Sequence, residues 1–227
     1  MGHRRTAAIF GATGLVGRAC LDLLLADARY VRILAIGRRD PAQSDAKLVV
    51  RRAALDTVAA FDDPTLGTVD DVFCCLGTTL KTAGSQAAFR RVDLDYVVNT
   101  ASFAKRHGAP HFLMVSAVGA DARSRVFYSR VKGEAESAVA KLGIESVSIF
   151  RPSFILGPRD APRLGERLGM VVATGLSFAM VARLSKYRPI AAATIARAML
   201  AAAVTPAAGV TVYEFDGMAT LRACGTA

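Results

Sequence analysis

Apolar segments of strand length alternate with segments of helical periodicity along most of the 227-residue chain. The strand-length segments lack polar alternation, which is typical of buried strands in a parallel sheet built from βαβ units. Strands are predicted at 6–10, 31–37, 47–53, 70–77, 111–117, 146–152 and 210–215. Helices are predicted at 15–27, around 84–107, at 124–142 and at 194–204.

This order predicts an α/β protein with a Rossmann-like, doubly wound parallel sheet. The length fits a single domain over residues 1–227, and no linker-like Ser, Gly or Pro segment divides it. After Pro152 the pattern changes to loops and apolar helices. We therefore expect residues 153–227 to contribute a small substrate-covering lobe built on the same sheet.

The formal net charge of +10 could favour nucleic acid, but the basic residues are scattered. They lack interleaved aromatics and any recognised nucleic-acid-binding motif, so we expect no nucleic-acid partner. The four cysteines form no Cys-x-x-Cys pair and two are adjacent, which favours a reducing cytoplasm over a disulfide framework. The N-terminus passes directly into the first predicted strand, so we expect no cleavable signal peptide. The three histidines show no ligand spacing, so no metal site is expected.

The segment 168–184 is uncharged and mostly apolar. It is shorter than the roughly 20 residues that cross a bilayer, and a buried or interface helix fits it better than a transmembrane one. Arg167, Arg183 and Lys186 flank it, so peripheral contact with an anionic membrane stays open.

A glycine-rich turn joins the first predicted strand to the first helix in the sequence AAIFGATGLVGRA. Glycines permit unusual backbone angles, let the main chain approach a pyrophosphate and let the helix pack tightly on the sheet. The amides at the helix start then face the anion. We assign dinucleotide contacts to Gly11, Thr13, Gly14, Leu15 and Gly17.

The choice of nucleotide depends on the segment AIGRRDP at the end of the second predicted strand. Arg38 and Arg39 occupy the place where NAD-binding proteins carry an acidic residue, and guanidinium groups suit a ribose 2′-phosphate. NADP is therefore favoured. A shift of one or two residues would present Asp40 instead and keep NAD as the alternative.

Three residues in order suggest catalysis: Ser116 ends a predicted strand, and Tyr128 and Lys132 follow within YSRVK. The spacing of four places Tyr128 and Lys132 on one helical face. Tyr-x-x-x-Lys alone is common, but its position after the glycine-rich turn and the strand-terminal Ser116 makes it specific. The alternative is a packed Tyr128, a solvated Lys132 and a serine that only ends its strand.

Through GATGLVG, the strand ending VSA and YSRVK, the chain resembles the short-chain dehydrogenase/reductase family. It is most similar to the atypical, extended-like subgroup that contains the Tat-interacting oxidoreductase and its bacterial NAD(P)-binding relatives. The resemblance runs from about Ala7 to Val204. The segments that carry it are FCCLGTTLKTAGSQAAFRRVDLDYV (73–97), VKGEAE (131–136), IFRPSFILGPR (149–159) and RPIAAATIARAML (188–200).

The resemblance implies that Tyr128 exchanges a proton with a carbonyl or alcohol oxygen while hydride moves to or from the nicotinamide. A free phenol ionises near pH 10, so a nearby cation such as Lys132 is needed to favour phenolate. By the same resemblance Lys132 hydrogen-bonds the nicotinamide ribose, and Ser116 holds the substrate oxygen. Further cofactor contacts are implied at Leu76, Gly77, Thr78, Pro152 and Ser153.

Other polar positions are weaker candidates. Asp93 and Asn99 fit helix capping or solvent exposure at least as well as a functional role. Cys74 and Cys75 fit core packing better than redox chemistry.

The leading interpretation is an NADP-dependent oxidoreductase for a small carbonyl or alcohol substrate, acting as a monomer or homodimer. A second is an NADP(H)-binding regulatory or interaction protein with little or no catalysis. A third is a sugar-nucleotide epimerase or dehydratase, although the segment after Pro152 is short for the substrate lobe of such enzymes.

Overall fold

The computed structural model describes residues 4–61, 67–157 and 186–224. Its main sheet has seven strands, and every neighbouring pair is parallel. The strands are β1 (Arg5–Phe10), β2 (Tyr30–Gly37), β3 (Leu48–Arg52), β4 (Asp71–Cys74), β5 (His111–Val115), β6 (Ser146–Phe150) and β9 (Gly209–Tyr213). Their spatial order is β3-β2-β1-β4-β5-β6-β9.

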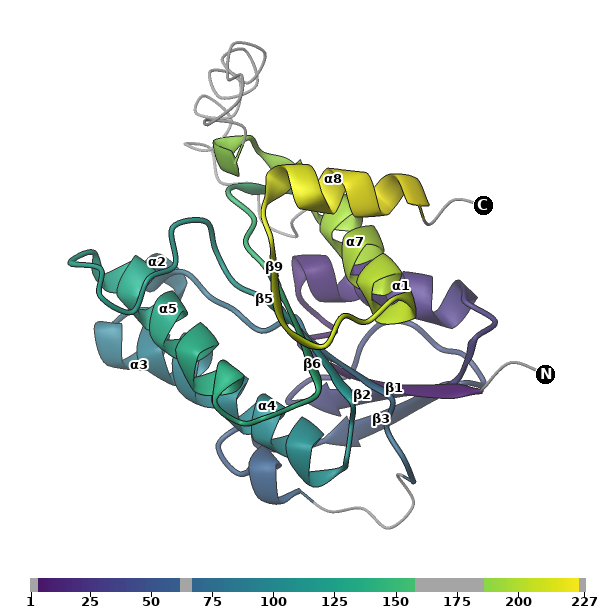
Figure 1. The fold of residues 1–227 in the computed structure, drawn as a ribbon. Coiled ribbons are helices and arrows are strands. Elements are labelled where there is room, and N and C mark those ends of the chain that lie inside the picture. The colour runs from purple at the N-terminus through teal and green to yellow at the C-terminus, as the bar shows by residue number, and fades with distance from the viewer. Residues whose placement is uncertain (1–3, 62–66, 158–185, 225–227) are drawn as a thin grey trace.

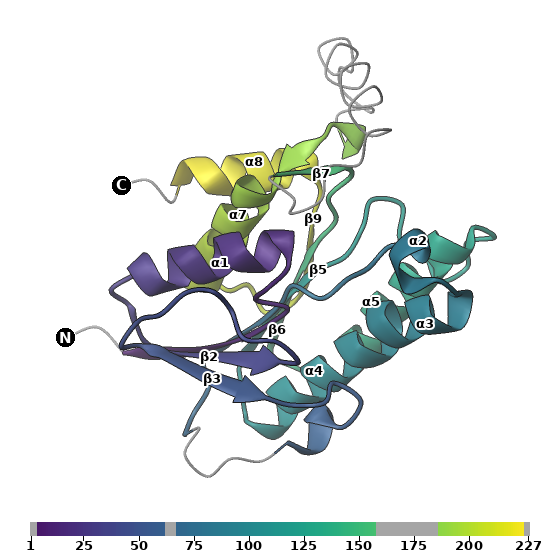
Figure 2. The same cartoon turned by 180° about the vertical axis from the view of Figure 1, so that it is seen from behind.

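Helices cover both faces of this sheet (Figures 1 and 2). One layer contains α1 (Leu15–Ala26), α7 (Ala192–Val204) and α8 (Phe215–Cys224). The other contains α3 (Gln86–Arg90), α4 (Tyr96–Arg106) and α5 (Phe127–Ala140), with the short α2 (Leu80–Ala83) beside them. Smaller elements are a 3-10 turn at Val58–Ala60 and a two-stranded pair, β7 (Ile155–Leu156) with β8 (Ile190–Ala191).

Alternate residues of the central strand pack into opposite helical layers. Ala7 and Ile9 of β1 join the core formed with α1 and α7, whereas Ala8 and Phe10 join the core beneath α4 and α5. Burial on both faces explains why the strand segments read as continuous apolar runs. The predicted Rossmann-like, doubly wound architecture is therefore confirmed.

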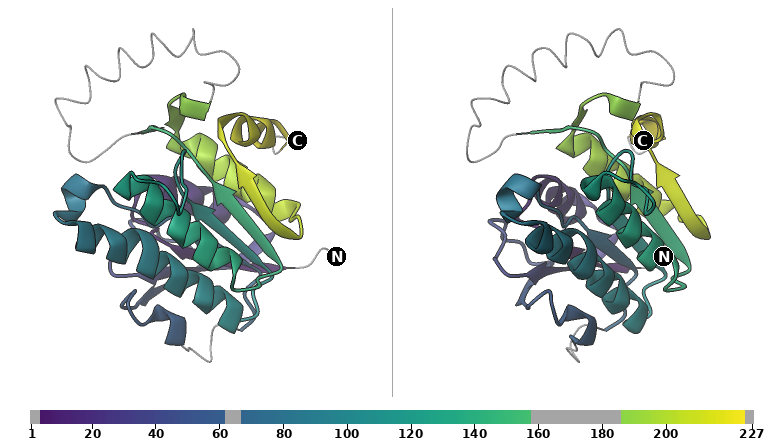
Figure 3. Two further views of the ribbon diagram at one scale, coloured as in Figure 1. Left: turned by 60° about the vertical axis from the view of Figure 1, so that its left-hand side comes forward. Right: turned by 90° about the vertical axis from the view of Figure 1, so that its left-hand side faces the viewer.

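The chain changes direction across the sheet between β3 and β4. It runs outward from β1 through β2 to β3, then returns to place β4 on the other side of β1, with Phe10 opposite Cys74. The two views in Figure 3 show the helical layers on either side of this sheet. In open α/β sheets ligands bind where the strand order reverses, outside the carboxyl ends of the strands.

The predicted long helix around 84–107 is interrupted by a π-helical turn, Arg91–Asp95, between α3 and α4. Such turns insert an extra residue and frequently mark functional sites. This one carries Asp93, whose side chain is fully buried. Helical periodicity predicted the helix correctly, but it carried no signal for the inserted turn.

A buried polar cluster lies at the opposite, amino-terminal edge of the strands. The Asp71 carboxylate, at the first residue of β4, accepts hydrogen bonds from the Tyr30 hydroxyl at 2.7 Å and from Arg5 at 2.6 Å. His111 Nδ1 lies 3.4 Å from the same carboxylate. Burial and the neighbouring Asp71 together raise the pKa of Tyr30. The cluster joins four neighbouring strands, β2, β1, β4 and β5, at one edge.

Three sequence-based predictions differ from the structure or lie outside the described residues. The predicted helix from 124 begins at Phe127, because the Ser124 hydroxyl accepts a hydrogen bond from the Val126 amide in a preceding turn. Helix α8 was not predicted. The apolar segment 168–184 lies outside the described residues.

Candidate functional site

The glycine turn after β1 packs directly against the end of β4. Gly11 has φ +81°, and a Cβ atom there would lie 2.7 Å from the carbonyl oxygen of Cys75. A Cβ atom on Gly17 would lie 2.0 Å from the Gly11 carbonyl oxygen, so α1 meets the turn in backbone contact. Gly14 occupies the N-cap position of α1. This glycine-lined cradle at a helix start fits a dinucleotide pyrophosphate.

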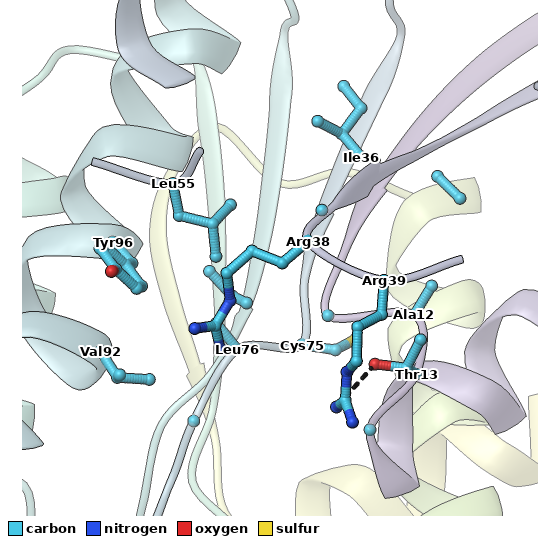
Figure 4. A pocket seen from close by; sticks show the side chains of 15 residues that line it. Ala12, Thr13, Ile36, Arg38, Arg39, Leu55, Cys75, Leu76, Val92 and Tyr96 are labelled. Atoms are coloured by element: carbon cyan, nitrogen blue, oxygen red, sulfur yellow. Dashed lines mark hydrogen bonds between the residues drawn. The ribbon is translucent and has the colours of Figure 1, made fainter. Parts of the chain in front are cut away.

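A pocket opens at this point, at the reversal of strand order (Figure 4). It is formed by the glycine turn, the end of β2, the loop after β3, the segment after β4 and the start of α4. It brings together seven of the predicted cofactor residues: Gly11, Thr13, Gly14, Arg38, Arg39, Leu76 and Gly77.

Both arginines of the nucleotide segment line this pocket. Arg39 Nη2 donates a hydrogen bond to Thr13 Oγ1 at 3.2 Å, and Arg38 extends between Leu55 and Leu76 (Figure 4). Asp40 is not among the lining residues. Its two carboxylate oxygens accept bonds from Arg52 at 2.9 and 2.6 Å, and Arg52 holds the pKa of Asp40 below its usual value. The pocket rim at β2 is therefore cationic.

The opposite wall consists of residues that sequence reasoning missed, chiefly Leu55 and Tyr96. Asn99 Nδ2 donates to the carbonyl oxygens of Leu55 and Asp56, both at 3.0 Å, and the Tyr96 hydroxyl bonds Asp56 at 3.1 Å. Asn99 thus anchors the loop that carries Leu55. The sequence does carry a signal for this wall. Every loop that follows a strand of a parallel sheet emerges at the same edge, so the loop after the third predicted strand could be expected to lie near the pocket.

Lys132 is buried beside the pocket and forms an ion pair with buried Asp93. Its Nζ lies 2.7 Å from Asp93 Oδ1, while Asp93 Oδ2 accepts the Thr78 amide at 2.9 Å. A Cβ atom on Gly77, which lines the pocket, would lie 3.8 Å from Lys132 Nζ. Burial opposes the charged amine, but Asp93 and then Tyr128 outweigh it, so the pKa of Lys132 is raised. Lys132 is not solvated, and Asp93 is its partner.

Tyr128 lies in the first turn of α5 and is half-buried, with its ring 5.4 Å from that of Phe89. Helix α5 packs closely against the loop that precedes it. A Cβ atom on Gly133 would lie only 2.2 Å from the Ala122 amide nitrogen, so only glycine fits there. Tyr128 and Lys132 share one face of α5. Neither side chain is part of the pocket lining, and Lys132 adjoins the pocket through Gly77.

Ser116 is buried and bonded to α5. Its hydroxyl donates to Glu136 Oε1 at 2.5 Å, and Arg151 binds the same carboxylate through Nε at 3.0 Å and Nη2 at 2.5 Å. The bond to Glu136 outweighs burial and raises the pKa of Arg151. Within the described residues no hydrogen bond joins Ser116 to Tyr128. Sequence reasoning missed both Glu136 and Arg151.

The remaining predicted cofactor residues border the site without lining the pocket. Pro152 is buried, and the Ser153 hydroxyl donates to the Arg188 carbonyl at 2.5 Å. Leu15 packs against Gly157, where a Cβ atom would lie 2.7 Å from Leu15 Cδ1. These contacts tie the segment after β6 to the residues just before β8 and to the start of α1.

The adjacent cysteines have different surroundings. Cys74 is buried in the core, where Thr100 donates to its sulfur at 3.3 Å, and burial raises the pKa of its thiol to about 11. Cys75 lines the pocket. Within the described ranges, no three His, Cys, Asp or Glu side chains gather as a metal site would require. No described helix has both the length and the apolar character of a membrane span.

Comparison with known proteins places this geometry in a family. Residues 11–207 match the profile of a family described as NAD(P)H-binding. The chain is 36% identical to Protein HTATIP2 of Rattus norvegicus over 91% of this chain and 84% of that protein. It is 30% identical to Protein FMP52, mitochondrial, of Coccidioides immitis over 96% of this chain and 92% of that protein.

Solved structures share the fold at low sequence identity. The enzyme WbmH of Bordetella bronchiseptica, in complex with NAD+, superposes with a TM-score of 0.69 at 16% identity, covering 93% of this chain and 76% of that chain. A UDP-glucose 4-epimerase of Thermotoga maritima, with UDP-glucose, gives 0.67 at 14% identity, covering 92% and 76%. The match to the family profile and the relatives together establish that this chain belongs to the NAD(P)H-binding family.

Proposed function

We propose that the protein is an NADP-dependent oxidoreductase acting on a small carbonyl or alcohol substrate. The observation that carries the proposal is the buried ammonium of Lys132, one helical turn after Tyr128 and beside Gly77 of the nucleotide pocket. Burial of a charge is costly, and an ammonium held at a pocket next to a phenol is expected where a proton must move.

The residues present fit a bound NADP. The glycine turn would hold the pyrophosphate, and Arg38 and Arg39, which line the pocket, would pair with the 2′-phosphate. The Asp40 carboxylate, which would otherwise suit the free ribose hydroxyl of NAD, is already bound by Arg52. Leu76, Gly77 and Thr78 would lie along the nucleotide, and Pro152 and Ser153 near its carboxamide. When bound, the nicotinamide ring supplies or accepts the hydride.

The chain's own residues would carry out the proton transfer. Tyr128 Oη would donate its proton to a carbonyl oxygen during reduction and accept one from an alcohol during oxidation. Lys132 stabilises the phenolate and would bond the nicotinamide ribose, while Asp93 keeps the amine protonated. Ser116 would hold the substrate oxygen. We further propose that residues 153–227 cover the substrate and that the protein acts in the cytoplasm, although the FMP52 relatives are named mitochondrial.

The direct test is to identify by mass spectrometry the nucleotide that the purified protein retains, then to screen carbonyl compounds for NADPH oxidation. NADPH or NADP+ in the protein and turnover of at least one carbonyl support the proposal. Nucleotide binding that changes a protein interaction, with no turnover, supports the regulatory alternative. Conversion of a sugar nucleotide without net oxidation supports the epimerase.

A further inference from the structure

We propose that Cys20 and Cys75 are a redox-sensitive pair, which a hydroperoxide joins in a reversible disulfide, and that this crosslink lowers the affinity of the pocket for its nucleotide. The pair lies outside the proposed catalytic set. The inference goes beyond the proposed function, because it concerns nucleotide binding alone and needs no carbonyl or alcohol substrate.

Cys75 joins the nucleotide pocket to the core beneath it. It follows the last residue of β4 and is one of the residues that line the pocket. Its amide donates to the Phe10 carbonyl at 2.9 Å, and its own carbonyl oxygen would lie 2.7 Å from a Cβ atom on Gly11. The backbone of Cys75 is therefore held directly against the glycine turn.

Cys20 meets Cys75 from the helical side of the same core. It lies in α1 and is fully buried in the core formed with α1 and α7. The Cys75 side chain packs against that core, and the two thiols are hydrogen-bonded to each other. Cys74 belongs to the opposite core. Alternation along the strand therefore pairs Cys75, and not Cys74, with Cys20.

Access decides which thiol reacts first. Cys20 is fully buried, whereas Cys75 is half-buried and borders the pocket, so a molecule as small as hydrogen peroxide can reach Cys75. The hydrogen bond with Cys20, together with burial, raises the pKa of the Cys75 thiol. Because the thiolate is the nucleophile, the first step is slow near neutral pH. Cys20 is then the adjacent thiol that completes the reaction.

The reaction consumes two thiols and one hydroperoxide. The Cys75 sulfur attacks one peroxide oxygen, the O–O bond breaks, and Cys75 becomes a sulfenic acid while the other oxygen leaves with the thiol proton. The Cys20 sulfur then attacks the Cys75 sulfur, forming the S–S bond, and the sulfenic hydroxyl leaves as water with the Cys20 proton. With hydrogen peroxide the products are one disulfide and two waters, and the two electrons lost by the sulfurs reduce the peroxide.

The crosslink would disturb the glycine turn. A covalent bond brings two sulfurs closer together than a hydrogen bond does. The surrounding backbone has little room to follow, because a Cβ atom on Gly11 would already lie 2.7 Å from the Cys75 carbonyl oxygen, and one on Gly17 would lie 2.0 Å from the Gly11 carbonyl oxygen. Drawing Cys20 and Cys75 together must therefore displace the turn or rotate the Cys75 side chain out of the pocket wall. Either change alters the surface that would hold the pyrophosphate.

Core packing is the competing explanation, since a buried cysteine often behaves as a small apolar side chain. It would account equally well for Cys74 in the opposite core. The two explanations differ in the products of oxidation. Packing alone predicts no crosslink, and sustained peroxide then drives Cys75 to sulfinic acid, which added thiols do not reverse. A redox pair predicts a disulfide that added thiols do reverse.

The experiment treats the 227-residue protein with hydrogen peroxide at about pH 8.5, with and without NADP+, and maps the products by mass spectrometry. Trypsin leaves Cys20 in the peptide 19–29, and Cys74 and Cys75 together in the peptide 53–81. The crosslink joins these two peptides with the loss of two hydrogen atoms. NADPH affinity is then titrated on the crosslinked protein before and after reduction with dithiothreitol.

Two variants identify the pair. Cys20→Ala removes one partner and leaves the pocket lining unchanged. Cys74→Ala is the matched control, because it removes the neighbouring buried thiol and leaves Cys75 as the single cysteine of the peptide 53–81. Circular dichroism establishes that each variant is folded before oxidation, and Cys20→Ser replaces Cys20→Ala if the alanine variant does not fold.

We expect the crosslink in the wild type and in Cys74→Ala, and its absence from Cys20→Ala, where dimedone should instead trap Cys75 as the sulfenic acid. The crosslinked protein should bind NADPH about tenfold more weakly, the size of one lost hydrogen bond to a charged group, and dithiothreitol should restore the affinity. NADP+ at about ten times its Kd should slow crosslinking about tenfold, because peroxide enters only the empty pocket.

Absence of the joined peptides in the wild type, or their loss in Cys74→Ala, would overturn the inference in favour of packing. A crosslinked protein that binds NADPH as tightly as the reduced one would overturn it as well. Neither result touches the proposed oxidoreductase function, which depends on Tyr128 and Lys132. Failure of the wild type to reduce any carbonyl would sink that function alone, since crosslinking and NADPH affinity are measured without a substrate.

Discussion

Lys132 Nζ lies 2.7 Å from Asp93 Oδ1, and both side chains are buried. Without Asp93, burial becomes the main influence on Lys132 and lowers the pKa of its amine. We expect Asp93→Asn to reduce the free energy of unfolding by about 3–5 kcal/mol, the usual cost of an orphaned buried charge. NADPH affinity should also fall more steeply with rising pH than in the wild type. Thermal shift across a pH series measures both effects.

Asp95→Asn is the matched control, since Asp95 is exposed in the same π-helical turn. Should both variants lose NADPH affinity to the same extent, the turn itself, and not the ion pair, would be the source of the effect.

Arg38 and Arg39 should set the preference for NADPH. Replacing both with Ala removes the charged donors for a 2′-phosphate, and we expect a loss of about 10–100-fold in NADPH affinity with little change for NADH. Isothermal calorimetry with each nucleotide provides the comparison, and Arg123→Ala, at an exposed loop position, is the control. Equal affinity of the wild type for the two nucleotides would reject the assignment.

Gly14 should be required for nucleotide binding more than for folding. A Cβ atom there would lie 3.3 Å from the Gly11 carbonyl, a tight contact, and the branches of valine would enter the space of the pyrophosphate. Wild-type protein should gain thermal stability with NADPH by mass action, and folded Gly14→Val should not. Gly17→Ala should differ by failing to fold well, because its Cβ would meet backbone at 2.0 Å. A normal NADPH shift in Gly14→Val would remove Gly14 from the site.

Tyr128→Phe should separate catalysis from binding. The ring and its contact with Phe89 are kept while the proton donor is lost, so fold and NADPH affinity should persist. Single-turnover hydride transfer should slow by about 10²–10⁴-fold, the usual contribution of a general acid. Lys132→Ala should weaken NADPH binding as well as turnover. Wild-type rates in Tyr128→Phe would show that the proposed mechanism is wrong.

The buried thiol of Cys74 should make stability depend on alkaline pH. Burial raises its pKa from 9.0 to about 11, so between these values the thiol ionises in the unfolded chain but stays protonated in the fold. The unfolded state is then favoured, and stability falls as the pH rises through this window. Urea unfolding of wild type and Cys74→Ala should show a shallower fall for the variant. Parallel curves would mean that the thiol ionises equally in both states.

The parts of the site that the sequence predicted are those set by local spacing. The glycine turn, the arginine pair and the stripe of Tyr128 and Lys132 each lie within one strand-turn-helix or one helix, where the residue order determines the geometry. The strands and the main helices followed from periodicity for the same reason. Helix α8 escaped prediction because its ten residues, FDGMATLRAC, show no strong apolar stripe.

Partners contributed by distant segments could not be predicted in this way. Asp93 reaches Lys132 because a π-helical turn reorients one residue, and helical periodicity does not reveal such a turn. Glu136 meets Ser116 and Arg151 only because α5 packs over the ends of β5 and β6. Each contact depends on the packing of whole elements, which no window of sequence describes.

The four residues of β4 connect two regions with different tasks. The strand begins at Asp71, within the polar cluster that includes Tyr30 and Arg5, and ends at Cys74, immediately before the residues that line the pocket. Side chains at the pocket rim can therefore be exchanged during evolution while the amino-terminal anchorage of the same strand is retained. A protein with this arrangement can therefore acquire a new cofactor or substrate preference while its fold stays unchanged.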